Sequence, residues 1–253
     1  MVKLIFLGTA AAVADKNHQN THLALVGEQG LLLIDCEGSP ILRLDEMGIN
    51  LPQRMTDLLL THFHPDHVAG MPSLVMSCWL MGRRHPLHVH GLDYTLERAE
   101  KLMALFEMDD WPNFYPLVYH PTPQAELCPV IDRPEFKVYG SPVCHLLPTM
   151  GLRIELPGSG KVIAYSCDTA PCDPVVRLAR DADVLVHEAT GAGNGHSSAA
   201  QAGQVAARAG ARALYLIHYH STGAADDEQL VAQARSTFDG PVHLAVDCME
   251  LTF

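Results

Sequence analysis

The sequence predicts an α/β fold with four layers, a four-layer αββα sandwich of two mixed β-sheets with helices on both outer faces. Short apolar runs bounded by Gly, Asp or Asn recur along the chain, which is typical of β-strands. Segments with helical spacing of apolar residues alternate with these runs, and the pattern restarts after residue 135 without a low-complexity linker. Because each sheet must bury one face against another layer, two such halves favour a sandwich. We therefore expect a single domain over residues 1–253.

The individual elements follow from these patterns. Strands are expected in the first half at 3–8, 22–27, 30–35, 56–62 and 87–91, and in the second half at 136–140, 150–156, 161–168, 182–190, 213–220 and 241–251. Helices are expected at 68–82, 93–108, 171–182, 197–211 and 226–238. Residues 111–136 are rich in Pro and aromatic side chains, which predicts an irregular connection between the halves, near the mouth of a site.

Composition narrows the class of protein. The 253 residues contain no run of about 18 to 20 uncharged apolar residues, so we expect a soluble protein with no membrane partner. Seven Cys at irregular spacings predict reduced thiols and a cytoplasmic location. The formal net charge of -12 argues against an extended nucleic-acid surface. Fifteen His are unusual and favour metal binding, because neutral imidazole suits metals such as zinc.

The stretch THFHPDHVAG, residues 61–70, carries the strongest chemical signal. His62 and His64 follow an apolar strand two positions apart, so in extended backbone both rings point to one side. Pro65 disfavours helical backbone at His64. Asp66 and His67 come where the chain turns into the next helix and can face a second point. The motif alone therefore predicts a metal site, and its two directions indicate two adjacent metals.

This motif resembles the HxHxDH motif of the metallo-β-lactamase fold superfamily. The superfamily's other ligands are a lone His, a bridging Asp and a final His, each at the end of a strand. The resemblance implies that His145, Asp168 and His218, which occur in that order, are these ligands. By this likeness one metal would be held by His62, His64 and His145, and the other by Asp66, His67 and His218, with Asp168 bridging them. His220 is a second candidate for the last position.

Two metals at such a site can activate a bridging water, so a metal-bound hydroxide is the expected nucleophile. Zinc is the expected metal, and manganese or iron also suit such ligands. Several motifs, among them FLGTAAAV, SCDTAPC, HEAT and GHSS, are similar to ribonuclease Z and its phosphodiesterase relatives. That similarity implies that Glu188 orients His196, which protonates the leaving oxygen. The expected catalytic residues are therefore Asp66, Glu188 and His196.

The chain departs from ribonuclease Z in three places. A tight PGSG turn at 157–160 stands where tRNA-processing enzymes carry a long, basic, tRNA-binding arm. The loop DCEGS, which begins at Asp35, is one residue short, and its Asp is expected to support the site from behind. Cys167 stands where a Gly commonly precedes the bridging Asp. The paired Arg83 and Arg84 suit either a substrate phosphate or a solvated turn.

The sequence thus predicts a hydrolase with two divalent metal ions. The favoured activity is a phosphodiesterase acting on a small or cyclic phosphodiester, a nucleotide among them, or on an RNA end. A tRNA 3′-processing endoribonuclease and a lactonase or thioesterase are alternatives, and a metal-binding module without activity is a third. Family resemblance also implies a homodimer.

Overall fold

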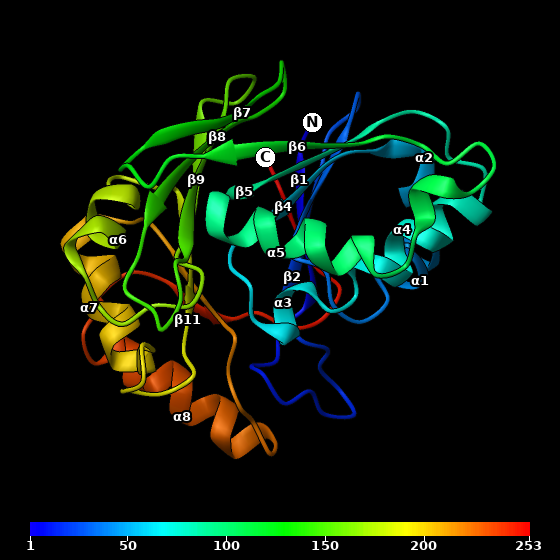
Figure 1. Ribbon diagram of the computed structural model, residues 1–253. Coiled ribbons are helices and arrows are strands. Elements are labelled where there is room, and N and C mark those ends of the chain that lie inside the picture. Colours follow the sequence, from blue (N-terminus) through cyan, green and yellow to red (C-terminus); the bar gives the residue numbers. More distant parts are fainter.

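The computed structural model describes residues 1–253 as two seven-stranded sheets that face each other, with helices on the outer faces (Figure 1). The first sheet has the order β14 (Met249–Thr252), β1 (Lys3–Gly8), β2 (His22–Val26), β3 (Leu31–Ile34), β4 (Met55–Leu60), β5 (Leu87–Leu92) and β6 (Leu117–Thr122). The second has the order β13 (Val242–Leu244), β12 (Leu214–Ile217), β11 (Val184–Glu188), β10 (Lys161–Tyr165), β9 (Met150–Leu156), β8 (Lys137–Pro142) and β7 (Cys128–Asp132). The predicted four-layer α/β sandwich is confirmed.

The helices divide between the two outer faces. On the first sheet lie α1 (Pro40–Glu46), α2 (Leu51–Arg54), α3 (Pro65–Val68), α4 (Met71–Leu80), α5 (Asp93–Ala104) and a short 3-10 helix, Met108–Asp110. On the second lie α6 (Asp173–Leu178), α7 (Ala199–Ala209) and α8 (Ala224–Arg235). Helix α7 has the best-defined N-terminus, where Ser198 and Gln201 form a reciprocal capping box.

Alternation along the strands explains the layers. In β3 every residue is buried, yet Leu31 and Leu33 belong to the core under the helices, whereas Leu32 and Ile34 belong to the core between the sheets. Successive side chains of a strand point to opposite faces, so a strand covered on both sides reads as an unbroken apolar run. Both sheets share this central core, and we propose on that basis that residues 1–253 form one domain.

Three parts of the chain differ from the sequence-based expectation. The segment 111–136 is not irregular throughout, because it contains β6 and β7, the last strand of each sheet on the same side of the sandwich. Helices α1 and α2 were not predicted. The last expected strand divides in two, and its second part, β14, crosses to pair with β1 of the first sheet.

The connection between β9 and β10 is short, as expected. The two strands pair antiparallel from Leu156 opposite Lys161 onward, so residues 157–160 form only a turn. No tRNA-binding arm is present at this position. No helix is long and apolar enough to cross a lipid bilayer.

Candidate metal centre

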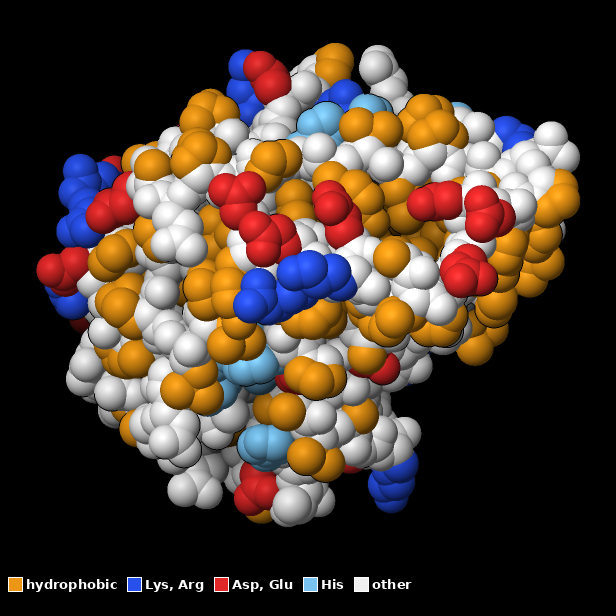
Figure 2. Space-filling view, in the orientation of Figure 1, with side chains coloured by type: hydrophobic (Ala, Val, Ile, Leu, Met, Phe, Trp, Pro, Cys, Tyr) orange, Lys and Arg blue, Asp and Glu red, His pale blue; other side chains and the backbone are white.

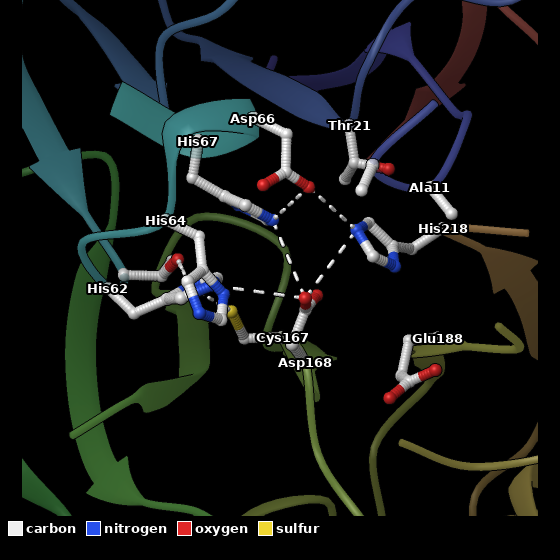
Figure 3. Close-up of polar contacts among 12 residues, drawn as sticks. Ala11, Thr21, His62, His64, Asp66, His67, Cys167, Asp168, Glu188 and His218 are labelled. Carbon is white, nitrogen blue, oxygen red and sulfur yellow. Dashed lines mark hydrogen bonds and ion pairs between the residues drawn. The ribbon is translucent and has the colours of Figure 1, made fainter. Parts of the chain in front are cut away.

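All predicted ligands lie at one edge of the sandwich, on loops that follow the strands or, for Asp66 and His67, in the short helix α3. Strands β8, β10, β11 and β12 run in the same direction, so the segments that follow them emerge at the same end of the second sheet. The HxHxDH loop follows β4 of the first sheet and meets them there (Figure 3). Figure 2 shows histidine side chains reaching the surface in this region, below a small group of Lys and Arg side chains.

The first group of ligands comes from two loops. His62 Nε2 lies 3.0 Å from His64 Nδ1, and His145 Nε2 lies 3.2 Å from the same His64 atom. His64 keeps extended backbone, with φ -90° and ψ 150°, so its ring stays on the side of the His62 ring, as predicted. Three imidazole nitrogens thus converge on one point.

The second group brings together the end of the motif and a distant strand. His67 Nε2 and His218 Nε2 each lie 3.5 Å from Asp66 Oδ2. Both imidazoles are buried, whereas Asp66 is partly exposed. Figure 3 shows the carboxylate of Asp66 and these two rings directed toward the same point.

Asp168 lies between the two groups. Its Oδ2 atom is 3.5 Å to 3.9 Å from imidazole nitrogens of both groups, namely those of His62, His67, His145 and His218. The other carboxylate oxygen, Oδ1, is buried without a partner. Despite burial, which raises its pKa, the neighbouring His218 and His67 hold the pKa of Asp168 well below its usual range. A carboxylate in this place suits a bridge between two cations.

Hydrogen bonds behind the rings assign their protons. His67 Nδ1–H donates to Asp35 Oδ2 at 2.8 Å. His145 Nδ1–H donates to Gly195 O at 2.9 Å, and His218 Nδ1–H donates to Thr190 Oγ1 at 2.8 Å. Each of these rings then presents a bare Nε2 lone pair to the centre.

The same logic holds for His62. Thr61 Oγ1 donates to Asp35 and accepts from His62 Nδ1, 3.1 Å away, so His62 Nε2 is also without a proton. The Nε2 atoms of His67 and His218 are buried with no partner. Converging lone pairs that lack donors are what a bound cation satisfies, and N/O donors of this kind suit divalent zinc, manganese or iron. The residues present therefore fit two divalent metal ions.

Three residues of the centre adopt left-handed backbone, which is uncommon for residues other than Gly. They are Asp35 (φ 60°), Cys167 (φ 52°) and His218 (φ 51°). Such conformations cost free energy and persist where the surrounding structure imposes them, often at functional sites. A Gly at position 167 would adopt this positive φ without the cost of a Cβ atom.

Cys167 contacts the back of a ligand and does not face the centre. Its Sγ atom is 3.7 Å from His62 Nδ1, the nitrogen that points away from the converging lone pairs. The side chain is fully buried in the core between the sheets. Burial raises the pKa of this thiol well above its usual range, so it is neutral and packs as a small apolar group.

Glu188, which is buried, and His196, which is partly exposed, form a pair beside the ligands. Glu188 Oε1 accepts from His196 Nδ1 (2.9 Å) and from the backbone N–H groups of Thr169 (3.0 Å) and Ser197 (3.1 Å). Its Oε2 accepts from the backbone N–H of Thr190 at 3.0 Å. The hydrogen bond that His196 donates to Glu188 raises the pKa of His196 above its usual value.

The His196 ring lies against the ligands. It stacks on the His218 ring with centroids 5.8 Å apart and meets the edge of the His145 ring at 4.8 Å. Ligand-type atoms of Asp168, His196 and His218 lie within 4.8 Å of one another. Its side chain is 19% exposed, which leaves it open to a substrate.

Three residues that the sequence offered as candidates lie outside the metal centre. His220 is exposed and takes no part in the metal-type groups, so His218 is the histidine that the fold selects. Arg83 is fully buried and donates to the backbone carbonyls of Pro52, Met55 and Pro86, which excludes a contact with a substrate phosphate. Arg84 donates to the backbone carbonyls of Trp79, in helix α4, and of Arg83.

Sequence reasoning missed the groups that orient the ligands. Thr61 supports His62, Thr190 supports His218, and the carbonyl of Gly195 supports His145. Thr61 and Thr190 directly adjoin predicted motifs, and a hydroxyl beside a ligand strand was the available signal. A backbone carbonyl carries no signal in the sequence.

Comparisons with known proteins agree with this geometry. Residues 33–219 match the family model described as "Beta-lactamase superfamily domain". Ribonuclease Z of Methanothermobacter thermautotrophicus is 29% identical over an alignment of 294 residues, covering 94% of this chain and 92% of that protein. The alignment is longer than the chain, so the relative has segments that this chain lacks.

Two solved structures share the fold over nearly the whole chain. The metallo-beta-lactamase fold protein YhfI from Bacillus subtilis superposes with a TM-score of 0.82 and 22% identity, covering 99% of this chain and 98% of that one. The short form of human tRNase Z gives a TM-score of 0.79 and 23% identity, with coverage of 99% and 98%.

The fold and the His/Asp cluster therefore define a metal-dependent hydrolase. The chain belongs to the beta-lactamase superfamily, and over nearly its whole length it is similar to ribonuclease Z, as the sequence motifs predicted.

Proposed function

We propose that the protein is a phosphodiesterase in which His196 donates a proton to the leaving oxygen. The observation that carries this proposal is the 2.9 Å hydrogen bond between Glu188 Oε1 and His196 Nδ1, made beside the ligand cluster. Glu188 holds the Nδ1 proton, so that the Nε2 atom of the protonated ring is the one that donates to a substrate.

We assign the metal-ligand roles as the sequence predicted them. One divalent ion would be held by His62, His64 and His145, the other by Asp66, His67 and His218, with Asp168 shared. When bound, such ions lower the pKa of water and neutralise phosphoryl oxygens. The chain itself then has to hold the ions, orient the substrate and supply the proton for the departing alkoxide.

The surroundings support a small substrate. The turn at 157–160 leaves no arm to grip a folded RNA, and the formal net charge is -12. A small or cyclic phosphodiester, a nucleotide among them, needs neither an arm nor a basic surface, and a short RNA end needs little more. We therefore favour these substrates over an intact precursor tRNA.

A second candidate function is tRNA 3′-end processing. The named relatives, ribonuclease Z among them, favour it, and the proposed site would serve either reaction. Cleavage of a precursor tRNA at nanomolar enzyme, with strong salt dependence, would support this candidate. A lactonase or thioesterase is a weaker alternative, because a carboxyl-type reaction has less need of the Glu188–His196 pair.

The test compares leaving groups of different basicity. The His196→Ala variant is expected to lose about 10² to 10⁴-fold in turnover of a phosphodiester with an alkyl leaving group, because an alkoxide needs a proton. Loss with bis(p-nitrophenyl) phosphate is expected to be much smaller, because p-nitrophenolate departs unprotonated. His220→Ala is the matched control, since this exposed histidine lies on the same loop as His218 but outside the cluster.

Two outcomes would contradict this role. Equal losses with both leaving groups would mean that His196 acts otherwise than as an acid. Lactone hydrolysis that survives loss of His196, without phosphodiester hydrolysis, would favour the carboxyl-type hydrolase.

Three further features of the proposal rest on the sequence. We propose that the metal is zinc, that the protein is a homodimer, and that it is cytoplasmic. Elemental analysis of the purified protein tests the first, light scattering the second, and localisation of a tagged chain in its host cell the third.

A further inference from the structure

Two cysteines lie on the loops that carry the candidate ligands His145 and Asp168. Cys144 directly precedes His145 and is exposed, and Cys172 lies four residues after Asp168 and is partly buried. Neither thiol has a role in the proposed reaction. Cys167 directly precedes Asp168 but is buried against His62, and Cys36 and Cys78 are buried elsewhere in the fold.

The two loops are joined at these cysteines. The carbonyl of Cys144 accepts from the N–H of Ala170 at 2.8 Å, which makes an isolated antiparallel bridge. Thr169 Oγ1 accepts from the N–H of Cys144 at 3.1 Å and lies 3.7 Å from Cys172 Sγ. Residues paired across such a bridge have Cα atoms about 4.5 to 5.5 Å apart, so Cys144 lies beside Ala170. The Thr169 hydroxyl in turn lies between the backbone of Cys144 and the thiol of Cys172.

The two cysteines also differ in exposure, because Cys144 is open to solvent and Cys172 is partly buried. Burial, and after it the neighbouring Cys172 thiol, raise the pKa of Cys144. Two cysteines on joined loops, one of them open to solvent, have the layout of an oxidisable thiol and its resolving partner.

We propose that Cys144 and Cys172 are a redox modification site, which a peroxide or a low-molecular-weight disulfide converts into an intrachain disulfide. With hydrogen peroxide, the exposed Cys144 thiol is oxidised to a sulfenic acid and one water is released. The Cys172 thiol then attacks that sulfur, the S–S bond forms and a second water leaves. Two thiols lose two electrons and two protons, and one peroxide accepts them.

Formation of this disulfide is expected to displace the proposed catalytic pair, Glu188 and His196, through Thr169. The Thr169 hydroxyl contacts both cysteines, and its backbone N–H donates to Glu188 Oε1 at 3.0 Å. Drawing the two sulfurs to bonding distance pulls on the loop that bears His145 and on the residue that holds Glu188. Because small misplacements at a reacting centre lower rates strongly, the oxidised protein is expected to be about tenfold less active or worse.

The experiment treats the reduced full-length protein with hydrogen peroxide or oxidised glutathione and measures intact mass, followed by peptide mapping. The wild type is expected to lose the mass of two hydrogens and to yield a crosslinked peptide containing Cys144 and Cys172. Cys144→Ser and Cys172→Ser are each expected to prevent this crosslink. Cys128→Ser, at a partly buried cysteine on β7, is the matched control and is expected to form it.

The mass readout does not depend on what reaction the protein catalyses, so failure of the proposed function leaves this test intact. Sulfenic or glutathione adducts without the crosslink, or a crosslink between other cysteines, would overturn the proposal. Oxidised protein that regains its initial rate on an activated phosphodiester after reduction supports the regulatory effect. An unchanged rate in fully crosslinked protein would refute that effect.

Discussion

The carboxylate of Asp35 orients His67 directly and His62 through one hydroxyl. His67 Nδ1 donates to Asp35 Oδ2 at 2.8 Å, and the Thr61 hydroxyl, which donates to the same carboxylate, accepts from His62 Nδ1. His62 and His67 belong to different ligand groups. One buried carboxylate therefore supports both proposed metal positions, which extends the supporting role expected from the sequence.

Replacing Asp35 by Asn is predicted to weaken metal binding. The amide N–H group of Asn would donate to His67 Nδ1 and move the ring proton to Nε2, the atom that should bind metal. Affinity is expected to fall by roughly 10 to 100-fold, measured by competition with a chromophoric chelator. Asn tolerates the left-handed backbone of this position, so the fold should persist. Asp45→Asn, an exposed position on α1, is the control, and equal affinities would contradict the assignment.

At position 167, Gly is predicted to be more stable than Ala. Cys167 has φ 52°, where a Cβ atom costs about 1 kcal/mol that Gly avoids. The measurement is urea unfolding of the metal-free Cys167→Gly and Cys167→Ala proteins. At Cys78, a buried residue of helix α4, the order should reverse by about 1 kcal/mol, because Ala favours helices. If Ala is the more stable at both positions, backbone strain at Cys167 is absent.

Asp57 is predicted to make the free energy of unfolding depend on pH. It is buried on β4 and accepts two hydrogen bonds from Arg133, at 3.0 Å and 2.7 Å, and one from His90 at 2.9 Å. Burial raises the pKa of Asp57, but the hydrogen bonds from His90 and Arg133 outweigh it and hold the pKa well below its usual range. The pairing ties the first sheet to the segment between β7 and β8.

Asp57→Asn is expected to lower the free energy of unfolding by about 2 kcal/mol near pH 6, because the charged hydrogen bonds to Asp57 are lost. The loss stays below that of a fully buried ion pair, because Arg133 keeps partial access to solvent. A lowered carboxylate pKa stabilises the fold above the ordinary pKa of about 4, and that contribution is lost as the pH falls further. The difference between wild type and variant should therefore shrink from pH 6 to pH 3 in urea titrations. Asp132→Asn, whose side chain is 75% exposed, serves as control, and a difference that does not change with pH would refute the linkage.

Much of the fold could be predicted because its strands are covered on both faces. Runs such as LLLI in β3 are apolar throughout, and the ligands stand where such runs end. The edge strands β6 and β7 were missed because Pro121 and Pro129 lie within them, and Pro is tolerated in a sheet mainly at an edge. The return of β14 to the first sheet depends on pairing across the whole chain, which a local pattern does not encode.

The candidate site, too, could be predicted only in part. Ligand order along the chain was readable, because each candidate is a histidine or aspartate next to a strand. Backbone strain at Cys167 and the support of His145 by a carbonyl depend on loop geometry, which side-chain identity does not reveal. Arg83 looked accessible in a polar turn, yet three backbone carbonyls that the fold brings around it bury its guanidinium group.

The most direct test of the account is a zinc titration of metal-free protein while hydrolysis of bis(p-nitrophenyl) phosphate is followed. Chelation should abolish activity, and added metal should restore it until two ions are bound per chain, because both ligand groups share Asp168. Asp168→Asn should bind less metal and stay inactive. A folded wild-type protein that binds two ions yet hydrolyses no activated phosphodiester would contradict the central claim.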